Sequence, residues 1–136
     1  MDERSIRDIA QRARLEGRDT LTEVEGLALL DALGIERPRH HFIRGQADVA
    51  GPPPFPGERA VVKVISPEIL HKTEAGGVAI VPNRPTDITA AVAAMEDIFT
   101  GTRVDGYTVN EFIVYEPRLG HEIIVGYRFA ADFGPV

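Results

Sequence analysis

The pattern of apolar and polar residues predicts a mixed α/β fold with three helices. Apolar positions recur at helical spacing in three segments, each flanked by residues that start or stop helices: 5–16, 22–33 and 86–99. Thr22 and Glu25 fit a capping box for the second helix, and Gly34 is expected to end it. Thr86 or Asp87 is expected to cap the third helix.

A β-branched run and a shorter apolar run predict two strands, 60–65 and 78–81, joined by a polar loop. Further strands are expected at three places: 41–43, 107–114 and 121–129. The segment 45–58 is rich in proline, which fixes φ and lacks a backbone N–H. We expect a stiff surface connector there, with a proline-rich ligand for a partner domain as the alternative.

Composition narrows the class of protein. The chain has 136 residues, 43% hydrophobic and 26% charged, as in a soluble globular domain of common size. A net charge of −6 argues against a nucleic-acid or anionic-membrane partner. No apolar run approaches the roughly 20 residues of a membrane span, and no signal peptide is visible. The absence of cysteine excludes disulfides and thiolate chemistry and fits a cytoplasmic location.

Candidate chemistry gathers between residues 63 and 77. Lys63 lies inside a strand, where a lysine is costly to bury unless an anion meets it. The following loop carries His71, Lys72 and the pair Gly76 and Gly77. Glycine lets backbone N–H groups turn toward a ligand, and lysine supplies positive charge. These residues predict an anion site, with phosphate as the first candidate; an ordinary hairpin with a charged tip is the alternative. The histidines show no metal-ligand pattern.

The string SPEILHKTEAGGV at 66–78, together with Lys63, resembles the signature of the ATP-grasp domain in NDP-forming acyl-CoA synthetases. These are the ADP-forming acetate–CoA ligases, relatives of succinyl-CoA synthetase. Other segments resemble the family's opening helix, hinge and following strand: 21–35, 106–109, 122–126 and 133–136. The resemblance implies an ATP-grasp N-terminal subdomain at 1–114 and an incomplete second subdomain at 115–136.

The resemblance also implies residue roles. Lys63 contacts ATP phosphate, and the loop containing Gly76 and Gly77 closes over the phosphates. Lys72, beside His71, neutralises the charge of the phosphoryl group that His71 takes. His71 takes a phosphoryl group transiently from a phosphohistidine on another subunit and passes it to ADP. The adenine-binding hinge is the run Glu111, Phe112, Ile113 and Val114. Glu122 lies near the ribose.

The implied reaction converts acyl-CoA, ADP and phosphate into acid, ATP and CoA. The Mg²⁺ ligands of the family are expected downstream of Val136, so the chain is expected to be a fragment that is inactive alone. Its implied partner is a CoA-binding α subunit or domain. Self-association through the exposed edge of the last strand is a further expectation. The alternative is a non-catalytic interaction or regulatory module, such as the ligase-like half of a protein acetyltransferase.

Overall fold

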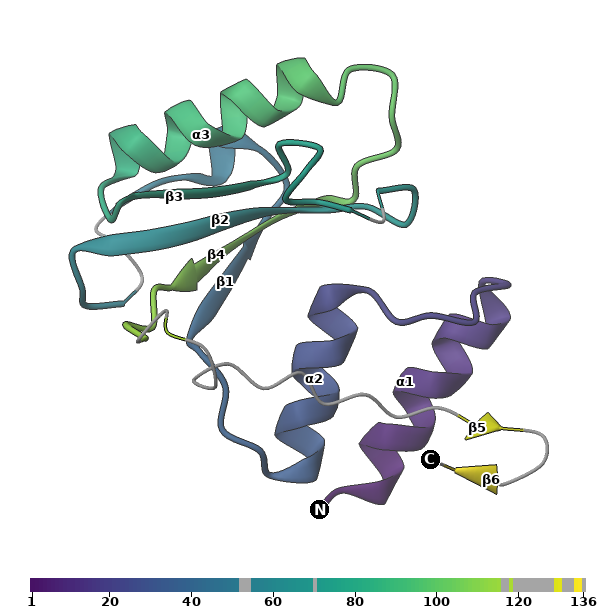
Figure 1. Cartoon of the computed structure of the whole chain (residues 1–136). Coiled ribbons are helices and arrows are strands. Elements are labelled where there is room, and N and C mark those ends of the chain that lie inside the picture. The colour runs from purple at the N-terminus through teal and green to yellow at the C-terminus, as the bar shows by residue number, and fades with distance from the viewer. Residues whose placement is uncertain (52–54, 70, 116–117, 119–128, 131–133, 136) are drawn as a thin grey trace.

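The computed structural model describes residues 1–51, 55–69, 71–115, 118, 129–130 and 134–135. Its centre is a four-stranded antiparallel sheet with strand order β1-β4-β2-β3. Figure 1 shows helix α3 along one side of this sheet and the helix pair α1–α2 beyond the other side. The predicted mixed α/β class is confirmed.

The strands pair as a continuous antiparallel ladder: β1 (His40–Ile43), β2 (Arg59–Ile65), β3 (Val78–Pro82) and β4 (Gly106–Glu111). The predicted strand 107–114 was therefore too long. Asn110 is opposite His40, the first residue of β1, and Glu111 is opposite Ala60 near the start of β2. β1 begins at His40 and β2 extends only one residue further, to Arg59, so residues 112–114 lie outside the ladder.

The C-terminal strand prediction, 121–129, falls almost entirely outside the described residues. What the structure describes there is a short pair, β5 (Phe129–Ala130) with β6 (Gly134–Pro135). The expected exposed edge of this strand stays a prediction.

The helices are α1 (Glu3–Leu15), α2 (Glu23–Leu33) and α3 (Pro85–Ile98), and a 3₁₀ turn, η1, spans Gln46–Asp48. The capping box of α2 is confirmed, and Gly34 ends this helix with φ +76°. The cap predicted for α3 was wrong, because Arg84 is the N-cap residue and Pro85 the first helical residue. Proline at this position has a helical φ already and no N–H to satisfy. Asp87 instead accepts a hydrogen bond from Arg84 Nε at 2.8 Å.

Period-two alternation divides the side chains of β2 between two environments. Ala60, Val62 and Val64 are fully buried and belong to the core that includes α3 residues Ile88, Val92 and Met95. Lys63 points to the opposite face, where Glu23 of α2 meets it. The sheet therefore buries an apolar face under α3 and turns a lysine-bearing face toward the helix pair.

The proline-rich segment contributes to the core and is more than a surface connector. Phe55 is buried and packs in the cluster under α3. Asn83, just after β3, donates from its side chain to the carbonyl oxygens of Phe55 at 2.9 Å and Gly57 at 3.1 Å. An apolar residue between prolines thus fixes this loop against the sheet.

Candidate functional site

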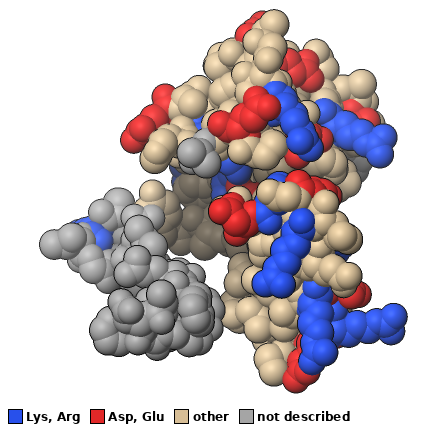
Figure 2. All heavy atoms as spheres, turned by 90° about the vertical axis from the view of Figure 1, so that its right-hand side faces the viewer, with Lys and Arg blue, Asp and Glu red and all other residues tan. Residues whose placement is uncertain are grey.

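A pocket of about 540 Å³ lies where the loop after β2 meets helix α2. Its lining includes Lys63, His71 and Lys72, three of the residues predicted to handle phosphate; the others are Glu23, Thr73, Glu74 and Val78. Figure 2 shows basic and acidic side chains side by side in the region where the helix pair meets the sheet. The structure therefore brings two of the predicted cations and the predicted histidine to one site.

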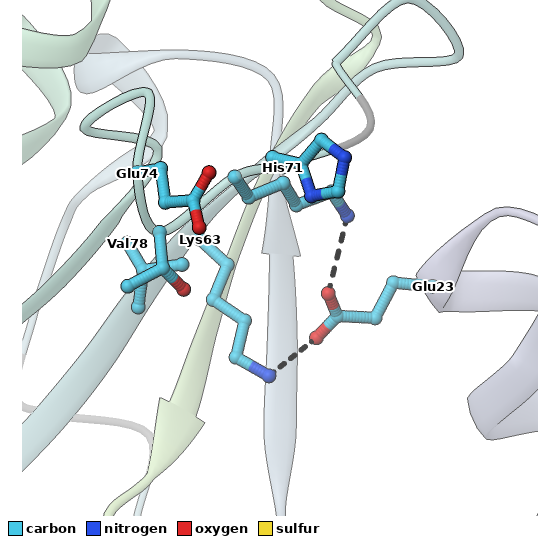
Figure 3. Close-up of a pocket in the computed structure, with 7 residues that line it drawn as sticks. Glu23, Lys63, His71, Glu74 and Val78 are labelled. Carbon is cyan, nitrogen blue, oxygen red and sulfur yellow. Dashed lines mark hydrogen bonds and ion pairs between the residues drawn. The ribbon is translucent and has the colours of Figure 1, made fainter.

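The two lysines of the pocket share one carboxylate. Lys63 Nζ lies 2.9 Å from Glu23 Oε1, and Lys72 Nζ lies 3.3 Å from Glu23 Oε2. Figure 3 shows Glu23 reaching from α2 toward Lys63, with both ion pairs dashed. The three side chains are partly buried, with exposed fractions of 34% for Lys63, 22% for Lys72 and 21% for Glu23. We call this arrangement the Glu23 bridge.

Each member of the bridge is held by its own local structure. Lys63 is fixed within the ladder, opposite Val78 of β3 and Thr108 of β4. Lys72 belongs to a loop closed by backbone hydrogen bonds, among them the one from Gly77 N to Lys72 O at 2.6 Å. Glu23 is the first residue of α2. The bridge thus joins three elements: Lys63 lies on a strand, Lys72 in a loop and Glu23 on a helix.

The start of α2 has separate support. The Arg18 guanidinium donates to both oxygens of Glu25, at 2.7 and 2.9 Å, and Glu25 also accepts from the Thr22 backbone N–H at 2.8 Å. The hydrogen bonds from Arg18 outweigh the effect of burial and lower the pKa of Glu25 to about 2. The same contacts raise the pKa of Arg18. Glu25 is therefore committed to helix capping, and of these two glutamates it is Glu23 that pairs with the lysines.

The loop glycines lie beside the pocket rather than in its described lining. Gly76 has φ +80°, which favours glycine, and its N–H donates to Thr73 O at 3.3 Å. A Cβ at Gly77 would lie 2.5 Å from Val64 Cγ1, so the second glycine is required by close packing. In this conformation both N–H groups are used within the loop. A role for them above a bound phosphate stays a prediction that needs the loop to open.

The predicted hinge residues lie outside the described lining of this pocket. Glu111 accepts from Arg39 Nη2 at 2.7 Å and Nε at 3.0 Å, and these hydrogen bonds lower its pKa. The Arg59 guanidinium lies 3.9 Å from the centre of the Phe112 ring, and Ile113 and Val114 are exposed. Glu122 lies outside the described residues. Adenine binding by this segment stays a prediction.

Two residue signals were missed in the sequence. Glu23 was not singled out, although it completes the bridge. In addition, among the 15 Lys and Arg residues only Lys63 and Lys72 are lysines. Ammonium is a compact point charge with three donors, whereas guanidinium is a wide planar fork, so the two are not equivalent at an anion site. Because the only two lysines of the sequence lie in this pocket, the choice of lysine over arginine is a sequence signal for an anion site there.

Comparison with known proteins gives the family. A family model described as an ATP-grasp domain matches residues 12–136, and the chain belongs to this family. It is 30% identical over 132 residues to the beta subunit of acetate–CoA ligase (ADP-forming) I of Pyrococcus furiosus, covering 95% of this chain and 55% of that protein. It is 27% identical over 128 residues to 4-hydroxybutyrate–CoA ligase (ADP-forming) of Nitrosopumilus maritimus, covering 94% and 18%.

Solved structures agree on the fold. ACD1 of Ca. Korarchaeum cryptofilum, in complex with coenzyme A, superposes with a TM-score of 0.75 at 26% identity, covering 95% of this chain and 56% of that one. Acetyl-coenzyme A synthetase 1 of the same organism, in complex with coenzyme A and Ca-AMPCP, gives 0.74 at 24% identity with the same coverage. The predicted ATP-grasp fold is confirmed. The chain spans about half the length, or less, of these relatives.

No group of three or more His, Asp or Glu side chains in the described part of the chain could hold a metal ion. Within the same residues, no helix has both the length and the apolar character needed to cross a membrane.

Proposed function

We propose that this chain is the nucleotide-binding part of an ADP-forming acyl-CoA ligase. The reaction converts acyl-CoA, ADP and phosphate into acid, ATP and CoA, in either direction, with a CoA-binding α subunit or domain as partner. One observation carries the proposal: Lys63 and Lys72 converge on a single anionic group in an open pocket of an ATP-grasp fold. Two ammonium groups that already share one pair of oxygens are suited to share those of a phosphate.

The proposed roles extend this pairing to the whole nucleotide. Lys63 and Lys72 hold nucleotide phosphate, and the loop with Gly76 and Gly77 covers it. The run Glu111, Phe112, Ile113 and Val114 at the end of β4 binds the adenine, and Glu122 contacts the ribose. Mg²⁺ accompanies the phosphates and spreads their charge; the proposal assigns no ligand for it within the described residues. We propose a cytoplasmic location, which the lack of cysteine favours.

His71 is the proposed relay for the phosphoryl group. It is exposed on the loop and lines the pocket with both lysines. A neutral imidazole nitrogen of His71 attacks the phosphorus of a phosphohistidine on the partner, whose N–P bond breaks as the new one forms. An oxygen of the ADP β-phosphate then attacks this phosphorus, the His71 N–P bond breaks, and ATP forms.

Phosphoramidate, a small phosphoryl donor, tests the relay without the partner. We expect the chain to take up one phosphoryl group on His71, located by mass spectrometry. The His71→Asn variant is expected to lose this label. Equal labelling of His40 and His41 would contradict the relay.

Calorimetric titration of the 136-residue chain with ADP and ATP tests nucleotide binding. We expect saturable heat for both ligands at concentrations up to millimolar. A flat trace with each nucleotide, both from this chain and from a Glu23→Gln variant that frees the two lysines, would overturn the proposal and favour the alternative, a non-catalytic interaction module.

A further inference from the structure

We propose that Glu23 is an internal competitor for nucleotide phosphate: it pairs with Lys63 and Lys72 and is displaced from them by an incoming polyphosphate. The inference rests on the proposed function, because it assigns the same two lysines to phosphate. It adds a residue outside the lysine-bearing loop that sets the affinity and charge selectivity of the site.

The geometry of the bridge matches that of the ligand it is proposed to replace. Each carboxylate oxygen of Glu23 faces a different ammonium group, at 2.9 and 3.3 Å. Two oxygens on one phosphorus present the same divided pattern of acceptors. All three side chains line the open pocket, so a soluble anion can reach the lysines at the place where Glu23 now binds them.

The charges of the two lysines explain why a polyphosphate would displace Glu23. One carboxylate leaves the two ammonium groups with a net charge of about +1, so a monovalent anion that replaced Glu23 would leave the local charge unchanged. ADP and ATP carry more charge and neutralise both lysines after Glu23 has left. The bridge therefore favours polyphosphates over monovalent anions, an effect that salt should weaken.

The bridge is not needed to start helix α2. The Thr22–Glu25 capping box and the Arg18 contacts already fix that end. Glu23 follows the cap directly, and its side chain lies in the pocket rather than on the capping groups. Within the described residues, the Glu23 side chain bonds only to the two pocket lysines, so it is available for exchange.

Substitution of Glu23 provides the test, with ADP binding measured by calorimetry. Glu23→Gln keeps the shape and removes the charge. Each exposed or partly exposed ion pair contributes about 0.2–1 kcal/mol, so loss of two pairs is expected to tighten ADP binding by about twofold to thirtyfold. Glu23→Asp keeps the charge on a shorter side chain that cannot reach both lysines, and its affinity should be intermediate.

Asp19→Asn is the matched control. Asp19 is exposed in the turn before α2, outside the described lining of the pocket, so this change removes one negative charge without freeing a lysine. ADP affinity is expected to stay within about twofold of the unsubstituted chain.

The outcomes separate this inference from the proposed function. If the unsubstituted chain binds ADP and both Glu23 variants bind it equally or more weakly, Glu23 positions the lysines and the inference is wrong. If the chain and all variants bind no nucleotide, the proposed function fails as well. If Glu23→Gln alone binds ADP, the competitor role is supported in its strongest form.

Discussion

Replacing Lys63 by methionine is expected to weaken ADP binding by about thirtyfold or more. Truncating one partner of a hydrogen-bonded charge pair costs about 2–5 kcal/mol when the other partner stays buried, and about 1.4 kcal/mol is a factor of ten. Lys63 is one-third exposed, so we expect the low end of this range. Methionine keeps the apolar stem of the side chain within the strand.

The comparison needs one control and one charge-conserving variant. Arg7→Met removes a positive charge from the exposed face of α1, away from the pocket, and should leave ADP affinity within about twofold. Lys63→Arg keeps the charge but places a planar guanidinium where a compact ammonium fits. We therefore expect its ADP affinity to lie between those of Lys63→Met and the unsubstituted chain. Equal ADP affinity of Lys63→Met and the unsubstituted chain, measured by calorimetry, would show that Lys63 does not bind ADP.

Replacing Gly106 by alanine is expected to destabilise the fold by about 3 kcal/mol. Gly106 begins β4 with φ +151°, a conformation that side chains rarely adopt. A Cβ there would lie 2.6 Å from Ile43 O and 2.5 Å from Phe42 Cζ, and the backbone atom cannot turn away. Backbone strain and overpacking each cost about 1–3 kcal/mol.

Urea unfolding measures this loss, with Gly26→Ala as the control. Gly26 lies inside helix α2 and a Cβ there meets nothing within 4 Å, so alanine should stabilise the chain by about 0.5–1 kcal/mol. Opposite signs for the two variants are the expected result. Equal stability of Gly106→Ala and the parent chain would mean that β1 and β4 do not meet as described.

The sequence predicted those parts of the fold that depend on interactions between residues only a few positions apart. The capping box at Thr22 and Glu25 acts over three residues, and the β-branched run of β2 alternates over two. The end of β4 was misjudged because it depends on where β1 and β2 stop, and residues 112–114 keep an apolar, strand-like composition. The capping of α3 was misjudged because proline made a side-chain cap unnecessary.

The pocket was predicted only in part, because some of its residues are close in the sequence and one is distant. Lys63, His71 and Lys72 lie close in the sequence and form a recognisable motif. Glu23 is 40 residues from Lys63 and 49 from Lys72, so only the folded chain brings the three together. A lone glutamate at the start of a helix has the usual helix-capping composition, which hid its link to the site.

The central claim is that Lys63 and Lys72 bind nucleotide phosphate together, and amine labelling tests it most directly. The chain has only these two lysine amines and the N-terminal amine, so mass spectrometry after brief acetylation reports each one separately. With saturating ADP, acetylation of both lysines should slow by about fivefold or more, following the stronger ion pairing of a polyphosphate, while the N-terminus keeps its rate. Equal acetylation rates for Lys63 and Lys72 with and without ADP would contradict the account.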